Sequence, residues 1–187
     1  MAVVACLLVA APVVSASGQA GAGHKGFHAA VGLGSGSLKL TCDGCSNSSE
    51  NGTAIMLRFG GAIRPGVVLS GEINGWSKSY DDGTTGTVSW INFVAQLYPN
   101  PASGLFVKGG VGFGGLSAED GHDKVETSSA GAVVGAGYDI HLGRSFSLTP
   151  YADYLYASKG DAKFNGTTVA FKLGASLVHL GIAASWR

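Results

Sequence analysis

The sequence is short of charged residues. Asp, Glu, Lys and Arg make up 13% of its 187 residues, roughly half of the typical share of about 25%. The 12 basic and 12 acidic residues cancel, and the chain contains no basic run. A protein that binds nucleic acid needs such a run or patch to neutralise the phosphates. The composition therefore argues against nucleic acid as a partner.

Long apolar runs are also missing beyond the N-terminal segment. After about residue 20, no stretch approaches the roughly 20 consecutive apolar residues that a membrane helix needs. A membrane-spanning form of this chain must therefore be a β-barrel. Cysteine is equally scarce, with three residues in all, and no second cysteine pair or neighbouring histidine supports zinc. We expect neither a metal nor a cofactor.

The N-terminal segment is apolar and differs from the rest of the chain. Its apolar run has the length of a signal-peptide core and is too short to span a membrane. The run ends in Val14-Ser15-Ala16, the small-residue pattern that signal peptidase cleaves. We predict a signal peptide over residues 1–16, cleaved near Ala16 or as late as Ala20, and an exported barrel domain over residues 27–187.

Apolar and polar residues alternate with a period of two through the mature part. Between Ile55 and Arg64 the odd positions are mainly apolar, whereas the even positions include Arg58 and Gly60. Such alternation predicts β-strands. Leu173 and Leu177 have the opposite parity from the strand that follows, which predicts a bulge or a late strand start. We predict eight strands, over residues 27–40, 55–64, 67–78, 91–97, 105–114, 134–142, 146–156 and 178–186.

The predicted connections alternate between short and long. Short turns fall at residues 64–66, 99–104 and 143–145. Longer polar loops alternate with these turns, at about residues 41–53, 79–86, 117–128 and 158–169. An outer-membrane barrel has tight periplasmic turns and longer outward loops. The spacing therefore predicts an all-β, eight-stranded antiparallel up-and-down transmembrane β-barrel.

The composition of the polar face indicates which face points outward. A soluble barrel would place Lys and Glu on that face, whereas here it holds mostly Gly, Ala, Ser and Asn. Small residues suit a narrow lumen, and the apolar face suits lipid. A soluble barrel remains the alternative. We expect aromatic residues near strand ends to form interfacial girdles, namely Trp76, Trp90, Tyr98, Phe146, Tyr156 and Trp186.

Several segments carry a family resemblance. They are Phe93–Pro99, Gly109–Gly114, Thr149–Tyr154 and Leu180–Trp186. In these segments, and in its strand pattern over nearly the whole mature part, the chain resembles the small eight-stranded outer-membrane proteins of the OmpA transmembrane-domain, OmpX and OmpW kind. The resemblance implies a monomeric barrel in the bacterial outer membrane. Its implied partners are the membrane lipid, including lipopolysaccharide, and the barrel-assembly machinery.

Five charged residues fall on the predicted inward face: Arg58, Glu72, Lys108, Asp139 and Asp153. Charges inside so narrow a barrel must pair, because an unpaired charge costs several kcal/mol in a low-dielectric interior. The set fits either a salt-bridged polar plug or a gated ion path. We favour the plug, because eight strands leave an interior just wide enough for side chains.

The predicted loops contain two candidate sites. Cys42 and Cys45 are separated by Asp43-Gly44, and we predict a loop disulfide between them in an oxidising compartment. A redox pair or half of a metal site is the alternative. Acidic residues at 81–82 and 119–126 could hold calcium or bridge lipopolysaccharide phosphates. Their spacing matches no EF-hand, and we interpret them as solvated loops.

Three functions are compatible with these features. We favour a non-enzymatic protein with a structural or surface-interaction role, contacting an unidentified extracellular or host ligand through its loops. The second is a narrow pore for small solutes. The third, a lipid A-modifying enzyme, would need a histidine, a serine and an acid together at the outer rim. His141 and His179 lie elsewhere by parity, and only His122 falls in an outward loop, so no catalytic residue is assigned.

Overall fold

The computed structural model of the chain describes residues 26–42, 48–80, 85–100, 103–120, 123–164 and 167–187. Within these ranges the regular elements are all β-strands. No helix in this part of the chain is both long and apolar enough to cross a membrane.

The strands form one closed antiparallel sheet. Each long strand pairs with the next along the chain, β1 pairs with β9, and the pairing of β6 with β8 completes the cylinder. Of the nine strands in the described ranges, β7 has only two residues and pairs with the beginning of β8. The predicted eight-stranded up-and-down barrel is therefore confirmed. The strands are β1 (Gly26–Cys42), β2 (Ser48–Arg64), β3 (Val67–Ser79), β4 (Thr85–Leu97), β5 (Leu105–Asp120), β6 (Asp123–Tyr138), β7 (Ile140–His141), β8 (Phe146–Phe164) and β9 (Thr167–Trp186).

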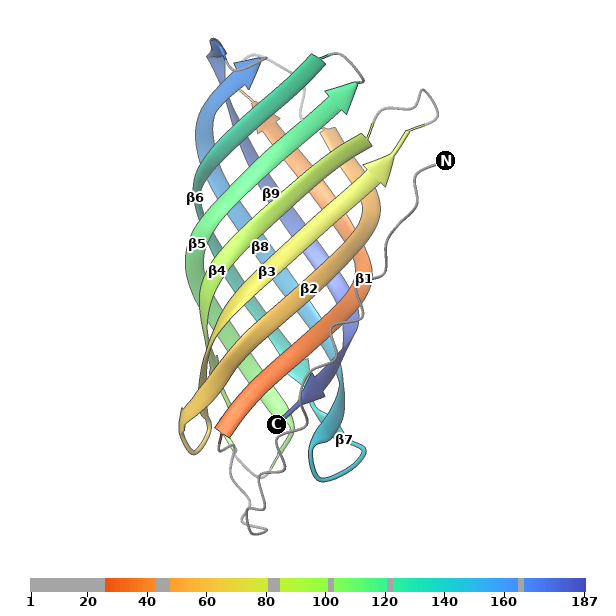
Figure 1. Cartoon of the computed structure of the whole chain (residues 1–187), viewed down its shortest axis with the longest axis vertical. Helices are drawn as coiled ribbons and strands as arrows, with labels where there is room; N and C mark the ends of the chain where they lie inside the picture. The colour runs from red at the N-terminus through yellow and green to blue at the C-terminus, as the bar shows by residue number, and fades with distance from the viewer. Residues whose placement is uncertain (1–25, 43–47, 81–84, 101–102, 121–122, 165–166) are drawn as a thin grey trace.

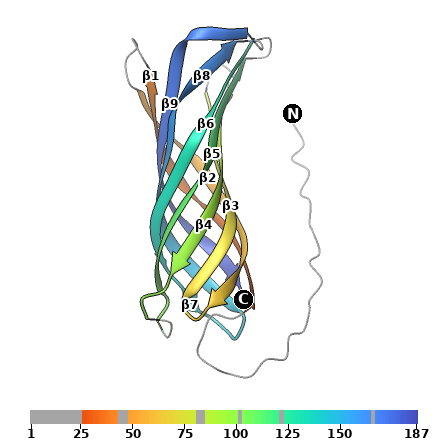
Figure 2. The ribbon, with the colours of Figure 1, turned by 90° about the vertical axis from the view of Figure 1, so that its left-hand side faces the viewer.

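The barrel is a tall cylinder of strongly tilted strands (Figures 1 and 2). The connections from β2 to β3, β4 to β5 and β7 to β8 lie at one end, which we call the turn end, and Figure 1 places the C-terminus there. We call the opposite end the loop end. The β2–β3 turn places Pro65 before Gly66, whose φ of 79° suits glycine at the third position of a type II turn. The carbonyl of Gly66 accepts from Tyr98 N at 2.8 Å, which joins neighbouring turns.

The strands run further toward the loop end than the sequence pattern predicted. Much of residues 117–128 and 158–169, expected as loops, consists of paired strand ends. Ser117 lies opposite Glu126, and Lys163 lies opposite Thr168. Backbone pairing does not require an apolar face, so polar residues on both faces of a projecting hairpin remove the period-two signal. The loop end therefore carries extended hairpins.

The last strand also begins earlier than predicted. β9 begins at Thr167 rather than near residue 178, and the irregularity lies in its pairing with β8, where the register shifts between Ala157 and Lys163. Leu177 is fully buried on the same face as His179. The parity of β9 does not change at Leu177. The residue is an apolar side chain that points into the barrel.

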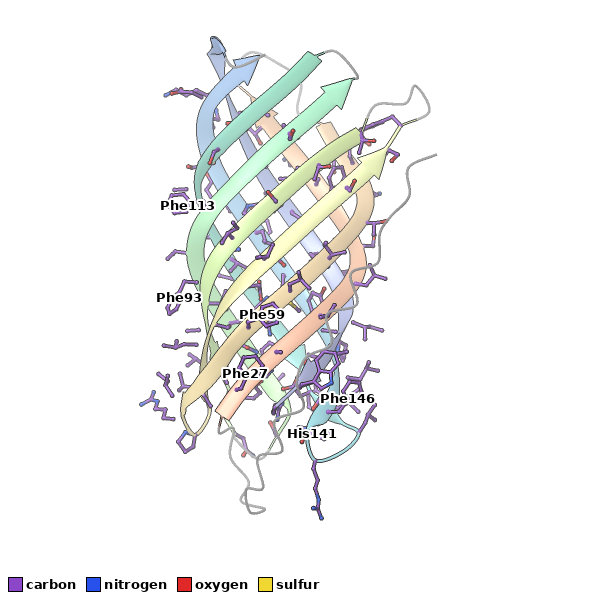
Figure 3. All side chains as sticks on the ribbon, in the orientation of Figure 1. Phe27, Phe59, Phe93, Phe113, His141 and Phe146 are labelled. Carbon is purple, nitrogen blue, oxygen red and sulfur yellow. The ribbon has the colours of Figure 1, made fainter. Side chains whose placement is uncertain are left out.

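The outer wall is apolar over most of its height. Figure 3 shows Phe27, Phe59, Phe93 and Phe113 at successive heights of this wall, and each has 52–69% of its surface exposed. Other exposed apolar residues from every long strand complete it, among them Val31, Leu33, Ile55, Ile73, Ile91, Val111, Val134, Tyr154, Leu180 and Ile182.

The aromatic girdle prediction is wrong for three of its six residues. Trp76, Trp90 and Tyr98 point inward, with exposed fractions of 2%, 0% and 4%. Their positions along the strands suggested a girdle, but their even parity matches that of the inward residues Glu72 and Asn92. Parity, which fixes the face of a strand, outweighs closeness to a strand end. On the outer wall, the Phe146 and Trp186 rings lie 5.6 Å apart, and Tyr156 is half exposed.

Candidate functional site

The lumen holds a buried network of charged and polar side chains, which lies nearer the turn end than the loop end of the strands. Arg58 Nε donates to Glu72 Oε2 at 2.7 Å. The ammonium of Lys108 lies 2.6 Å and 2.8 Å from the two oxygens of Glu72, and 2.8 Å from Asp153 Oδ2. Asn74 Nδ2 donates to Glu72 Oε1 at 2.8 Å. These five side chains, which we call the ion network, are at most 5% exposed.

Strand register explains how the network forms. Arg58 on β2 lies directly opposite Glu72 on β3, so their side chains meet on the inward face. Lys108 on β5 and Asp153 on β8 then reach Glu72 and each other across the lumen. Two cations face two carboxylates, so the charges balance. The structure thus brings together four of the five predicted inward charges.

The fifth predicted charge, Asp139, lies in a separate cluster at the turn end. It follows β6 immediately, where regular pairing stops. Tyr98 OH donates to Asp139 Oδ2 at 2.8 Å, and Thr149 Oγ1 donates to Oδ1 at 2.6 Å. The guanidinium of Arg187 pairs with the same carboxylate, and its other terminal nitrogen lies 2.9 Å from His141 Nε2. The five charged residues, predicted to form one network, therefore belong to two separate clusters.

An apolar cluster fills the lumen on the loop side of the ion network. Two tryptophans, Trp76 from β3 and Trp90 from β4, are its largest members. A cavity of about 10 Å³ borders the cluster at Val88, Ala157 and Ala175, and this volume is about the minimum for one water molecule. We call this cluster the apolar plug: Leu38, Ala54, Trp76, Val88, Trp90, Val94, Val133, Leu155, Ala157, Ala175 and Leu177.

Inward glycines make room for both tryptophans. A Cβ atom at Gly36 or Gly52 would lie 2.7 Å from the Trp76 ring, and one at Gly114 would lie 2.7 Å from Trp90 Nε1. Trp76 Nε1 also donates to the carbonyl of Gly36 at 3.0 Å. Each indole therefore packs on the backbone of glycines in other strands. Sequence reasoning missed the plug, although inward parity of Trp90, Val94, Leu155 and Leu177 was the available signal.

Another inward aromatic residue, Tyr151 on β8, extends over β9 as far as Gly32 on β1. Tyr151 OH lies 2.9 Å from His179 Nε2, and the two rings meet edge to face at 5.0 Å. A Cβ atom at Gly32 or Gly181 would lie 2.6 Å from that hydroxyl. His179 is therefore deep in the barrel, and His141 lies at the turn end. Neither is at the loop-end rim, where the enzyme hypothesis needed a histidine.

The remaining predicted sites lie wholly or partly outside the described residues. Cys45, His122 and the acidic pair 81–82 are among the residues that the structure does not describe, as is the signal peptide. The predicted Cys42–Cys45 disulfide therefore stays a prediction. Within the part of the chain that is described, no three His, Cys, Asp or Glu side chains are grouped so that they could hold a metal ion.

The comparison with protein families gives one match. The sequence profile described as the outer membrane protein beta-barrel domain matches residues 6–176. No curated protein sequence matches the chain.

Several solved structures share the fold, and NspA, Ail and AlkL are three of them. The Neisserial surface protein A, NspA, superimposes with a TM-score of 0.63 at 15% identity, over 88% of this chain and 98% of that one. Ail of Yersinia pestis gives a TM-score of 0.50 at 13% identity, over 84% and 98%. AlkL, whose structure was solved in lipid bilayers, gives 0.51 at 13% identity, over 91% and 94%. At these identities the likeness concerns the fold alone.

Proposed function

Because this chain belongs to the outer membrane protein β-barrel domain family, we propose that it is a closed, non-conducting barrel of the bacterial outer membrane. In this proposal it has a structural or surface-interaction role, expressed through its loop end, and catalyses no reaction. The observation that carries the proposal is the filled lumen. The ion network and the apolar plug lie one above the other, and both are almost completely buried.

Each layer opposes the passage of ions in a different way. The ion network offers no spare charge to attract an ion, and opening it would leave buried charges unpaired. The plug consists of apolar side chains, and a hydrophobic constriction blocks ions by staying dry. A narrow pore would require both layers to move, and the plug packs on backbone glycines that leave no room beside Trp76 and Trp90.

The outer wall supports a position within lipid. Its apolar side chains suit the hydrocarbon region, so outer-membrane lipid and lipopolysaccharide are the partners that we propose for this face. We further propose that the chain is exported by a signal peptide cleaved near Ala16, inserted by the barrel-assembly machinery, and present as a monomer. At the loop end, exposed side chains of both signs, including Lys39, Asp161 and Lys172, provide a surface for an extracellular ligand.

Gel mobility and single-channel recording test this proposal together. The chain from residue 17 is refolded in detergent, compared with and without boiling, and then inserted into planar bilayers. We expect a heat-modifiable band and no steady conductance. As a positive control for insertion and recording, a porin with an open channel is measured in the same bilayers. Steady conductance of the unmodified chain would instead support the narrow-pore alternative.

A further inference from the structure

One flank of the lumen carries polar side-chain atoms that have no hydrogen-bond partner among the residues that the structure describes. These are the hydroxyl of Ser70 on β3 and both side-chain amides on β4, Asn92 and Gln96, together with Nη2 of Arg58. All four residues are at most 2% exposed. Buried polar atoms in folded proteins are nearly always paired, either with protein or with ordered water.

The strand register places these side chains next to one another. Ser70 lies opposite Val94, and Asn92 and Gln96 flank Val94 on the same face. Ser70 also lies opposite Gly60, which is two residues from Arg58 on the same face of β2.

The group therefore covers one continuous region of β2, β3 and β4. It borders the ion network, because Asn92 lies opposite Glu72 and Gln96 lies opposite Lys108.

The chemistry of the group selects a neutral ligand that both donates and accepts hydrogen bonds. Each amide offers an acceptor oxygen and a donor nitrogen, the hydroxyl does both, and Arg58 Nη2 only donates. The neighbouring ion network is already balanced, so an added ion would have no counter-charge. Water is small enough for a lumen of this width and has the required donors and acceptors.

We infer that ordered water binds between Ser70, Asn92, Gln96 and Arg58, and completes the hydrogen bonding of the ion network. The hydrated group then borders the mainly apolar plug. In the plug, Trp76 Nε1 is bonded to the backbone of Gly36, whereas Trp90 Nε1 has no partner among the described residues. This inference does not depend on whether the barrel conducts.

Water-edited NMR of the isotope-labelled protein in lipid bilayers tests the inference. Magnetisation from water should reach the side-chain amide protons of Asn92 and Gln96 several-fold faster than the indole proton of Trp76. The variants Asn92→Leu and Gln96→Met assign the two amide signals by removing them. Transfer to both amides as slow as transfer to Trp76 would overturn the inference.

Stability of the same two variants gives a second, independent readout. If water bridges the group, replacing either amide by an apolar side chain leaves Ser70 and Arg58 without their bridge, and the urea midpoint falls. If the amides are dry and unpaired, the apolar replacement removes an unsatisfied group and the midpoint rises. Asn51→Leu, at an exposed position on β2, is the control for loss of a polar side chain. A rise in the midpoint for both lumen variants contradicts bound water.

Discussion

Glycine residues on the inner face of this barrel leave room for aromatic rings. Gly36 and Gly52 accommodate Trp76, and Gly114 accommodates Trp90. The glycines and the rings come from different strands, so the fit forms only when the wall is complete. A side chain at such a glycine would force a rigid indole, rather than a flexible chain end, to move.

Adding a side chain at Gly114 should therefore destabilise the barrel. For Gly114→Val we expect a loss of about 1–3 kcal/mol in unfolding free energy, the usual cost of overpacking a core. Urea titration in lipid vesicles measures the loss. Gly71→Val is the matched control, because a Cβ atom at that outward position meets nothing within 4 Å. Equal effects at the two positions would contradict the packing argument.

Glu72 is the residue on which the ion network depends most, because it binds both Arg58 and Lys108. Glu72→Gln keeps the shape and removes the charge, leaving two buried cations with one carboxylate. We expect a loss of about 3–5 kcal/mol in unfolding free energy, as for other broken buried pairs.

The partly exposed pair between Lys78 and Glu50 at the loop end supplies the control for this substitution. Glu50→Gln should cost about 1 kcal/mol or less, because solvent screens an exposed pair. Urea titrations of both variants at one pH give the comparison. A loss for Glu72→Gln no larger than that for Glu50→Gln would show that the network does not contribute in the expected way.

At the scale of strands, the paired ends of β5 and β6 continue well beyond the apolar wall. Their register continues to Asp120 opposite Asp123. These ends also pair with β4, as far as Thr85 opposite Glu119, and with β8, as far as Val125 opposite Phe164. All of these pairs lie beyond the apolar wall, so we expect them to add little to the stability of the barrel below.

Shortening this hairpin should leave the barrel intact. Replacing residues 118–125 with Asn-Gly joins Ser117 to Glu126, which lie opposite each other, through a two-residue turn that suits a hairpin. We expect an unchanged urea midpoint and a preserved heat-modifiable band on gels. A large fall in the midpoint would mean that the projecting strands hold the barrel together.

The outer wall could be predicted from the sequence because lipid favours an apolar residue at every outward position. The alternation of Leu57 with Arg58, or of Ile73 with Glu72, therefore predicted eight strands. Inward positions have no such uniform polarity, because the polar network and the apolar plug both consist of inward-facing residues. Leu177 consequently resembled a register fault, and Trp90 resembled a girdle residue. Asp139 was grouped with the ion network because parity gives the face of a residue but not its height.

For the whole molecule, the exposed apolar wall makes a prediction that separates a lipid-embedded barrel from a soluble one. Val111 on the outer face of β5 is 68% exposed. Within a bilayer, Val111→Arg should cost about 2–4 kcal/mol if the position lies near the midplane. In water the same substitution at an exposed site should be nearly neutral.

Thr87→Arg, at an exposed position of β4 near the loop end, is the matched control. It should cost much less, because the penalty falls toward the membrane surface. Folding titrations in vesicles give both values. Equal, near-zero effects at the two positions would contradict the lipid-facing wall.

The tryptophan-on-glycine packing also gives the protein its own fluorescent markers of assembly. The chain has three tryptophans, of which Trp186 is on the outer wall, while Trp76 and Trp90 are in the plug. Trp186 should respond when the chain meets lipid. The other two should reach a water-free environment only when strands distant in sequence have come together. Emission from variants that keep a single tryptophan would therefore separate, in time, adsorption to the membrane from closure of the cylinder.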